Sequence, residues 1–288
     1  MNSITGKRKR PTDIVLYSII GLFTVAVFAM TAYFAGYILI KGLRGISFAF
    51  LTTASNPIIG TIGILPAILN TAYIILLTLV FAVPVGVGGA VYINEYAKSR
   101  KLIRVIEFTT ETLSGIPSII FGVFGYVFFC TFLNLKVSLL SGAFTLTIMV
   151  LPTIIRTSQE ALKSVPLSYR EGAAGLGASK WYMIRTILLP NASSGIITAI
   201  VLSVGRIVGE SAALLLVAGG SAMYLPKGSF FEQIKSSGST LAVELYRYAY
   251  SRGENEVGFA IAALLLIIVI GLNLIVKLIG KRLNRGAK

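Results

Sequence analysis

The sequence lacks histidine and has a single cysteine and a single aspartate in 288 residues. An imidazole base, a histidine-ligated metal, an intrachain disulfide and a cysteine-ligated zinc site are therefore excluded. Because Asp13 is the only aspartate, a pair of intramembrane aspartates is impossible as well. The chain contains no GxxxxGK[ST] pattern and hence no P-loop for hydrolysing ATP. We expect no catalytic residues, no metal and no cofactor, and a chain that is not an enzyme.

Charge is also scarce, since only 13% of the residues are charged and 55% are apolar. A soluble globular domain carries about 25% charged residues, so lipid is the expected solvent. The net charge of +15 comes from short basic clusters that separate long apolar runs. Nucleic-acid binding needs basic residues gathered on one wetted face, which this pattern does not provide. We expect the lipid bilayer as a partner and no nucleic acid.

Six apolar runs are long enough to cross a membrane, which takes about 20 residues of helix. They are 14–40, 62–94, 112–133, 137–155, 191–218 and 257–276. Each run must be helical, because lipid offers backbone groups no other partner. The sequence therefore predicts an all-α polytopic membrane protein with six transmembrane helices. The first helix, 14–40, is too long for a signal-peptide core and is expected to be retained.

The basic residues also predict an orientation. Six spans place both termini on one side, and the segments on that side hold 18 Lys and Arg against seven on the other. Basic residues gather on the cytoplasmic side of a membrane, so both termini are predicted to be cytoplasmic. The basic tail 1–13 is expected to contact anionic lipid. Arg206 belongs to neither side, because it lies inside the fifth apolar run.

The cytoplasmic segment 156–190 has the pattern of short helices joined by turns. A capping box at 157–160 predicts the start of a short helix, and Pro166 breaks that helix or starts another. The glycine- and alanine-rich stretch that follows is intrinsically a weak helix, so its smooth surface is expected to serve a packing partner. Gly177 suits a left-handed C-terminal position, and Ser179 suits the cap of the next helix.

Within this segment, a motif resembles the EAA loop of ABC importer permeases. Glu171-Gly172-Ala173 is followed at the family spacing by Gly177 and by Ile187-Leu188-Leu189-Pro190, and Gly172 replaces the usual first alanine. Four further stretches resemble the PstA-type permease family of phosphate importers, and they are 65–71, 92–97, 114–125 and 206–212. Together the resemblance covers residues 60–280.

The resemblance implies a type I ABC importer (MetI-like) permease fold over 60–280, in a prokaryotic inner membrane. It implies that the EAA segment forms a coupling helix that docks on a separate ATPase. The implied coupling residues are Glu171, Gly172, Ala173, Ala174 and Gly177. The implied partners are a second permease subunit of PstC type, a dimer of PstB-type ATPases and an external phosphate-binding protein of PstS type. An ordinary solvated loop is the alternative interpretation.

Arg206 and Glu210 are the only charges in the fifth run, where they share one expected helical face with Ser203. The run of 28 residues is about 42 Å of helix, longer than the hydrocarbon is thick, so it must tilt, bend or protrude. In one interpretation the two charges form a neutralising pair that fixes helix packing. In the other, the arginine fork holds an oxyanion in transit and Glu210 holds the guanidinium in the empty state. The resemblance favours Arg206 as a substrate-pathway residue, and Glu210 and Ser203, on the same face, are predicted to join it there.

The external segment 219–256 carries glutamates and tyrosines. It is either a contact for the binding protein or a solvated loop with interfacial tyrosines. Three functions remain open for the chain as a whole. The first is a phosphate permease, and the second is an ABC permease for another oxyanion or an amino acid. The third is a secondary anion transporter that couples to protons through Arg206 and Glu210.

Overall fold

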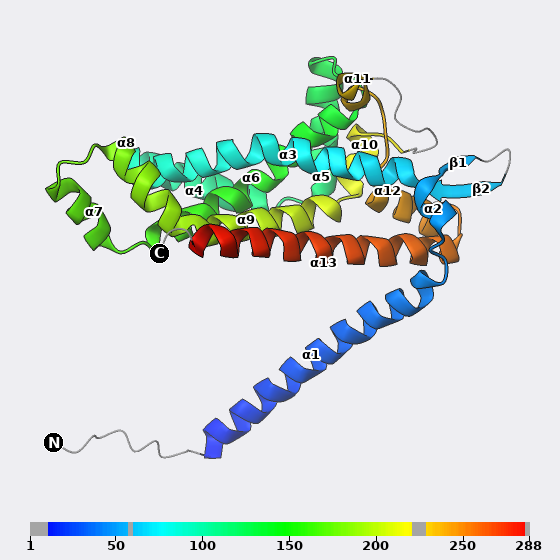
Figure 1. Ribbon diagram of the computed structural model, residues 1–288, viewed down its shortest axis with the longest axis horizontal. Coiled ribbons are helices and arrows are strands. Elements are labelled where there is room, and N and C mark those ends of the chain that lie inside the picture. The colour runs from blue at the N-terminus through cyan, green and yellow to red at the C-terminus, as the bar shows by residue number, and fades with distance from the viewer. Residues whose placement is uncertain (1–10, 57–59, 221–228, 286–288) are drawn as a thin grey trace.

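The computed structural model describes residues 11–56, 60–220 and 229–285 of the chain, and the predicted basic tail lies almost entirely outside them. Its long helices run side by side, except for the first, which leaves the bundle at an angle (Figure 1). The five long helices are α1 (Pro11–Leu43), α3 (Leu65–Val91), α6 (Leu139–Lys163), α9 (Leu189–Val208) and α13 (Asn255–Arg285). The chain is predominantly helical, as predicted.

The shorter elements connect and cap this bundle. The short α-helices are α2 (Phe48–Thr52), α4 (Arg100–Ser114), α5 (Ser118–Gly125), α7 (Leu167–Gly175), α8 (Lys180–Met183), α10 (Ala212–Val217), α11 (Phe230–Ile234) and α12 (Leu241–Tyr246). Wider helical turns with i→i+5 bonds are η1 (Tyr92–Tyr96), η2 (Tyr126–Phe132), η3 (Ile184–Leu188) and η4 (Arg247–Ser251). The strands β1 (Ala54–Asn56) and β2 (Thr61–Ile64), which the sequence did not predict, form an antiparallel pair.

Among the described residues, five helices are long and apolar enough to span a membrane, and a bent pair brings the total to six. The bent pair replaces the continuous third helix expected over 112–133. Arg100–Ser114 and Ser118–Phe132 meet at 102°. Pro117 starts α5 and also disfavours helical backbone in Ile116, so the chain turns there. Hydropathy reports the apolar composition of a run and does not detect this break.

The fourth span is longer than the expected 137–155, and the capping box at 157–160 is a wrong prediction. Helix α6 continues without interruption to Lys163. Within it Arg156 pairs with Glu160 one turn later, at 3.5 Å. The helix ends at Lys163, with Ser164 as its C-cap, because Pro166 disfavours helical backbone in the preceding Val165. The helix of the fourth span therefore ends eight residues later than the predicted 155.

The fifth span is also broken. Helix α9 ends at Val208 and α10 begins at Ala212, so 191–218 is not one helix. On its N-terminal side, α8, η3 and α9 together form one continuous span, Lys180–Val208. Pro190 lies in the first turn of α9 directly after the wide turn η3, and it does not end the helix. A wide turn accommodates a residue that has no N–H to donate.

The main core lies between α3, α6 and the α9–α10 region. Its fully buried residues include Ile74, Leu146, Met149, Ile154 and Leu214. Gly86 lets α3 approach α6 closely, because a Cβ there would overlap the side chain of Ile154. This close packing holds the bundle against which the segment 164–190 rests.

The segment 219–256 is packed against the bundle, so the prediction of a solvated loop is wrong for its described part. Glu244 is 2% exposed and accepts from Arg247, whose Nη2 lies 2.9 Å from the carboxylate. Tyr248 is buried and hydrogen-bonds Ser55 at 3.0 Å. Tyr250 remains exposed, but Tyr224 lies outside the described residues. A binding-protein contact here is restricted to the remaining exposed side chains.

Candidate functional site

The predicted coupling motif lies on α7 and the turn that follows it. Pro166 precedes the first residue of α7, and Ser179 caps α8 by accepting from the Tyr182 N–H at 3.3 Å. Gly177 has φ of +71°, the left-handed conformation that glycine adopts without a Cβ penalty. These three local predictions are confirmed. Figure 1 shows α7 at one end of the molecule, beyond α8 and away from the bundle.

The five predicted coupling residues have different surroundings. Ala173 is buried against Leu162, Met183 and Ile184, which anchors α7 to the bundle. The other four are exposed, and these are Glu171, Gly172, Ala174 and Gly177. A Cβ at Gly172 would meet no atom within 4 Å, so this chain itself does not need the small residue. The smooth side of α7 faces outward, where it is available to another protein.

Leu176, which the sequence analysis passed over, lies at the tip of this surface. Its side chain is 90% exposed. Large apolar side chains that are also exposed nearby are Leu167, Tyr169, Trp181 and Tyr182. Exposed apolar residues grouped on a polar segment are typical of a protein contact. The hydrophobic position directly before Gly177 was the signal in the sequence.

Arg170 and Glu95 connect α7 to the end of the second span. The Arg170 Nε and Nη2 donate to Glu95 Oε1 at 3.3 and 3.0 Å. Its Nη1 and Nη2 also donate to the carbonyl oxygens of Val165 and Leu162, at 2.9 and 3.0 Å. The Glu95 side chain is only 7% exposed and that of Arg170 19%. Such a shielded, multiply bonded pair is far less screened than a surface pair, so it holds η1 and α7 together.

Lys180 holds the same point from the other arm of the coupling hairpin, defined as 166–183. Its Nζ donates to the backbone carbonyl of Glu95 and lies 4.8 Å from the centre of the Tyr96 ring. The hairpin is therefore attached to η1 at both of its arms. Sequence reasoning missed these contacts, because 75 and 85 residues separate Glu95 from Arg170 and Lys180. The one indication was a lone glutamate at the end of an apolar span.

The membrane charges are arranged differently from the expectation. Within the described residues no ion pair includes Arg206, so the expected pair with Glu210 is absent. The break after Val208 removes the i,i+4 geometry, and Glu210 instead accepts from the Ala213 N–H at 3.0 Å. Ser203 is buried and donates to the Ala199 carbonyl of its own helix.

Arg206 lies in the last turn of α9, where a cation is favourable next to the helix carbonyls. Its side chain is half-buried. A Cβ at the adjacent Gly205 would meet no atom within 4 Å, and Leu202 is exposed. This face of α9 is not covered by the chain itself. A cation within a span that has no carboxylate partner indicates water, a solute or a second protein on that face.

A comparison with known protein families identifies the family to which this chain belongs. The family of binding-protein-dependent transport system inner membrane components matches residues 82–288. The chain belongs to this family. The matched region contains the coupling hairpin, Glu95 and the broken fifth span, so the main features of the site are features of a transport component.

Several curated proteins are similar to this chain along most of their length. A probable ABC transporter permease, YqgI, of Bacillus subtilis is 36% identical over 211 residues, covering 73% of this chain and 72% of that protein. The phosphate transport system permease protein PstA of Haemophilus influenzae is 31% identical over 262 residues, covering 90% and 88%. The PstA protein of Xylella fastidiosa strain Temecula1 is 36% identical over 196 residues, covering 68% of each.

Solved structures show the same fold. A bacterial ABC transporter that imports the polysaccharide alginate has a chain with a TM-score of 0.68 at 17% identity, covering 94% of this chain and 96% of that one. The MetNI methionine ABC transporter has a chain with a TM-score of 0.59 at 23% identity, covering 81% and 99%. The MetI-like permease fold that the sequence predicts for this chain is confirmed.

Proposed function

We propose that this chain is the permease subunit of an ATP-driven importer that moves inorganic phosphate into the cytoplasm. The observation that carries the proposal is the coupling hairpin, which presents exposed Leu176 and is attached through Arg170 and Lys180 to the end of a membrane span. A protein that pushes on α7 would thereby move α3. Such an attachment serves a permease whose energy is supplied by a separate ATPase.

The proposed substrate is inorganic phosphate, as the names of the PstA relatives suggest. Arg206 supplies suitable chemistry, because its planar guanidinium can donate two parallel hydrogen bonds to a tetrahedral oxyanion. It lies half-buried beside the break in the fifth span, on a face that this chain leaves uncovered. Glu210 is proposed to shape this break by capping α10, and Ser203 to support the helix that carries Arg206.

We propose that the chain works beside a second permease subunit of PstC type, two PstB-type ATPases and an external PstS-type binding protein. The uncovered face of α9 suits a second membrane subunit, and the exposed residues of the coupling hairpin suit the ATPase. The N-terminal end of α1, the C-terminal end of α13 and α7 lie on one side (Figure 1). This supports an orientation with both termini and the ATPase contact in the cytoplasm, and β1 and β2 outside.

The function is tested by reconstituting the four-component importer in vesicles that enclose ATP. We expect uptake of labelled phosphate only when both the binding protein and ATP are present, and no comparable uptake of labelled sulfate. Phosphate uptake that persists without ATP would contradict an ATP-driven importer and favour a secondary transporter. Uptake of sulfate at the same rate as phosphate would be consistent with an ATP-driven permease but would contradict phosphate as its specific substrate.

A further inference from the structure

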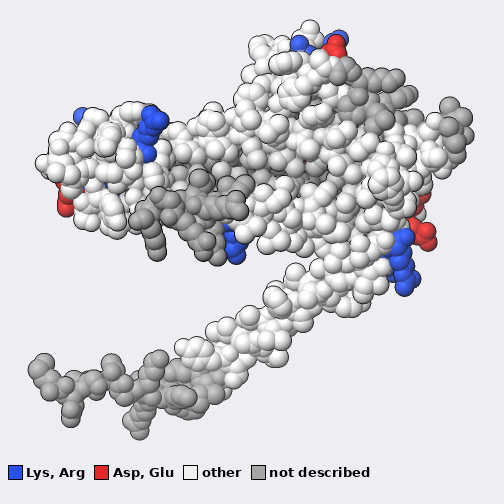
Figure 2. Space-filling view, in the orientation of Figure 1, with Lys and Arg blue, Asp and Glu red and all other residues white. Residues whose placement is uncertain are grey.

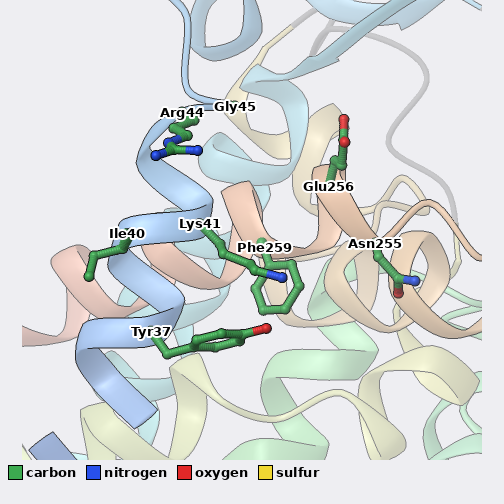
Figure 3. A pocket seen from close by; sticks show the side chains of 8 residues that line it. All are labelled: Tyr37, Ile40, Lys41, Arg44, Gly45, Asn255, Glu256 and Phe259. Carbon is green, nitrogen blue, oxygen red and sulfur yellow. The ribbon is translucent and has the colours of Figure 1, made fainter. Parts of the chain in front are cut away.

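A pocket of about 540 Å³ lies where the end of α1 meets the beginning of α13. Both helices are candidate membrane spans, Val15–Leu43 and Asn255–Leu278, and the pocket lies at one end of each. It is therefore at the boundary between hydrocarbon and water. Figure 3 shows Tyr37, Lys41 and Arg44 on one wall, from α1 and the residues that end it, and Phe259 on the other.

Gly42 fixes the walls of this pocket relative to each other. The residue is buried against α13, and a Cβ at position 42 would overlap the carbonyl oxygen of Phe259 and the side chain of Ala263. The two helix backbones are therefore in direct contact, as at other small-residue crossings in membranes. Lys41 and Arg44 flank this contact, so their positions are set by helix packing and not by a loop.

The pocket carries an excess of positive charge. The Lys41 Nζ lies 4.9 Å from the centre of the Tyr37 ring and 5.4 Å from that of Phe259. Within the described residues neither Lys41 nor Arg44 has an ion pair. Glu256 is the only carboxylate in the wall, and Figure 3 shows its carboxylate pointing away from Lys41. Two cations against one carboxylate favour an anionic occupant.

The surroundings narrow the choice of anion. Aromatic rings beside the cations are typical of the headgroup level of a bilayer. Below the pocket, none of the most apolar part of α1 is buried, and its exposed side chains include Phe23, Phe28 and Tyr33. A free anion would use the charges alone, whereas a lipid would use both the charges and this apolar surface. We infer that the pocket binds the phosphate group of an anionic phospholipid whose acyl chains lie along α1.

The inference goes beyond the proposed function, because a structural lipid at this site does not depend on which solute is transported. It is tested by native mass spectrometry of the assembled importer, released from nanodiscs that contain phosphatidylglycerol and phosphatidylcholine. We expect one retained phosphatidylglycerol per copy of this chain. The Lys41→Gln/Arg44→Gln variant should lose it, with affinity reduced about fivefold for each cation removed. The control Lys136→Gln/Lys235→Gln removes the same charge from two exposed residues that do not line the pocket, and it should keep the lipid.

Equal retention by the Lys41→Gln/Arg44→Gln variant and the wild type would overturn the inference. So would release of the lipid by millimolar inorganic phosphate, which would assign the pocket to the free anion. Cross-linking from Lys41→Cys to the second permease subunit at full yield would assign it to that subunit. If the double variant does not assemble, the single variants Lys41→Gln and Arg44→Gln decide, and each should lower lipid affinity about fivefold. Unchanged lipid retention in both assembled single variants would contradict the lipid site.

Discussion

At the scale of single residues, Glu95 joins the end of the membrane helix α3 to the coupling hairpin, which lies far from it in the sequence. Its carboxylate accepts from Arg170 and its backbone carbonyl accepts from Lys180, so both arms of the coupling hairpin converge on it. A charge that is 7% exposed is stable only while it is paired. The hairpin and the end of α3 are thus expected to move as one body.

We predict that Glu95→Gln separates ATP hydrolysis from transport. The substitution leaves the guanidinium of Arg170 shielded without a carboxylate, which costs about 3 kcal/mol of stability. It should lower the number of phosphate ions moved per ATP hydrolysed about tenfold. The ratio is measured in vesicles, from the uptake of labelled phosphate and from the unlabelled phosphate that ATP hydrolysis releases.

Glu111→Gln provides the matched control, since Glu111 pairs with Arg156 at 3.2 Å while both side chains remain largely exposed. An exposed pair contributes about 0–1 kcal/mol, so this variant should transport normally. Normal coupling in Glu95→Gln would contradict the assigned role. Partial rescue in Glu95→Arg/Arg170→Glu would support a direct pair.

Arg206 is the residue that we predict to bind phosphate during transport. Arg206→Gln should abolish phosphate uptake while the complex still assembles, because no other cation is expected on this face of α9. Arg206→Lys keeps the charge but loses the planar fork, so we expect it to retain reduced uptake. Uptake at the wild-type rate in Arg206→Gln would remove the residue from the pathway.

Glu210→Gln distinguishes the two roles considered for Glu210, which are capping α10 and holding the Arg206 guanidinium by its charge. The amide oxygen of glutamine can still accept from the Ala213 N–H, so the cap on α10 is preserved. If capping is its role, uptake and its dependence on phosphate concentration should both stay near wild type. A large shift in the phosphate concentration for half-maximal uptake would instead favour a direct charge interaction with Arg206 or the anion.

At the scale of elements, the sequence predicts the features that neighbouring residues determine, and it does not predict those that depend on contacts between distant segments. The turn at Gly177, the cap at Ser179 and the start of α7 after Pro166 follow from neighbouring residues, and all three were predictable. The breaks at 115–117 and 209–211 lie inside runs that are apolar on average, so mean hydropathy does not reveal them, even though Pro117 and Glu210 mark the two places. The fold of 229–254 depends on contacts with α3, such as Asn70 donating to the Ser239 carbonyl at 3.1 Å.

The coupling hairpin leads to a prediction about docking. Leu176→Asp should weaken binding of the ATPase subunit about thirtyfold, since a leucine buried at an interface contributes about 2 kcal/mol. The unfolding temperature of the isolated permease should not change, because Leu176 is 90% exposed. Pull-down of the ATPase measures the first effect and fluorescence-detected melting the second. A lowered melting temperature with normal docking would place Leu176 in the fold instead of the interface.

At the scale of the whole molecule, charge is segregated along the long axis. On the face shown in Figure 2, the middle of the molecule and the described length of α1 are almost free of charged side chains. Charged residues gather at the two ends and on the projection that carries α11 (Figures 1 and 2). The uncharged middle matches the band that hydrocarbon would cover. The number of spans was therefore predictable from the sequence, although their continuity was not.

The proposed orientation predicts opposite labelling of two exposed serines. In a background that replaces the single cysteine, Cys130→Ser, a membrane-impermeant maleimide should label Ser251→Cys in intact spheroplasts. Ser168→Cys on α7 should be labelled only after permeabilisation, because the hairpin is expected in the cytoplasm. The opposite pattern would invert the topology while leaving the fold unchanged.

The break between α9 and α10 also limits how dry the interior of this protein can be. Where α9 ends, the carbonyl groups of Gly205 and Ile207 accept from the N–H groups of Gly209 and Glu210, but no regular helix continues to serve the carbonyl groups that follow, and lipid tails offer no donors. Water or a neighbouring protein group must therefore reach Gly209 to Ser211 even when nothing is being transported. The side chains around this break must therefore keep small ions from leaking through the resting importer while they admit water.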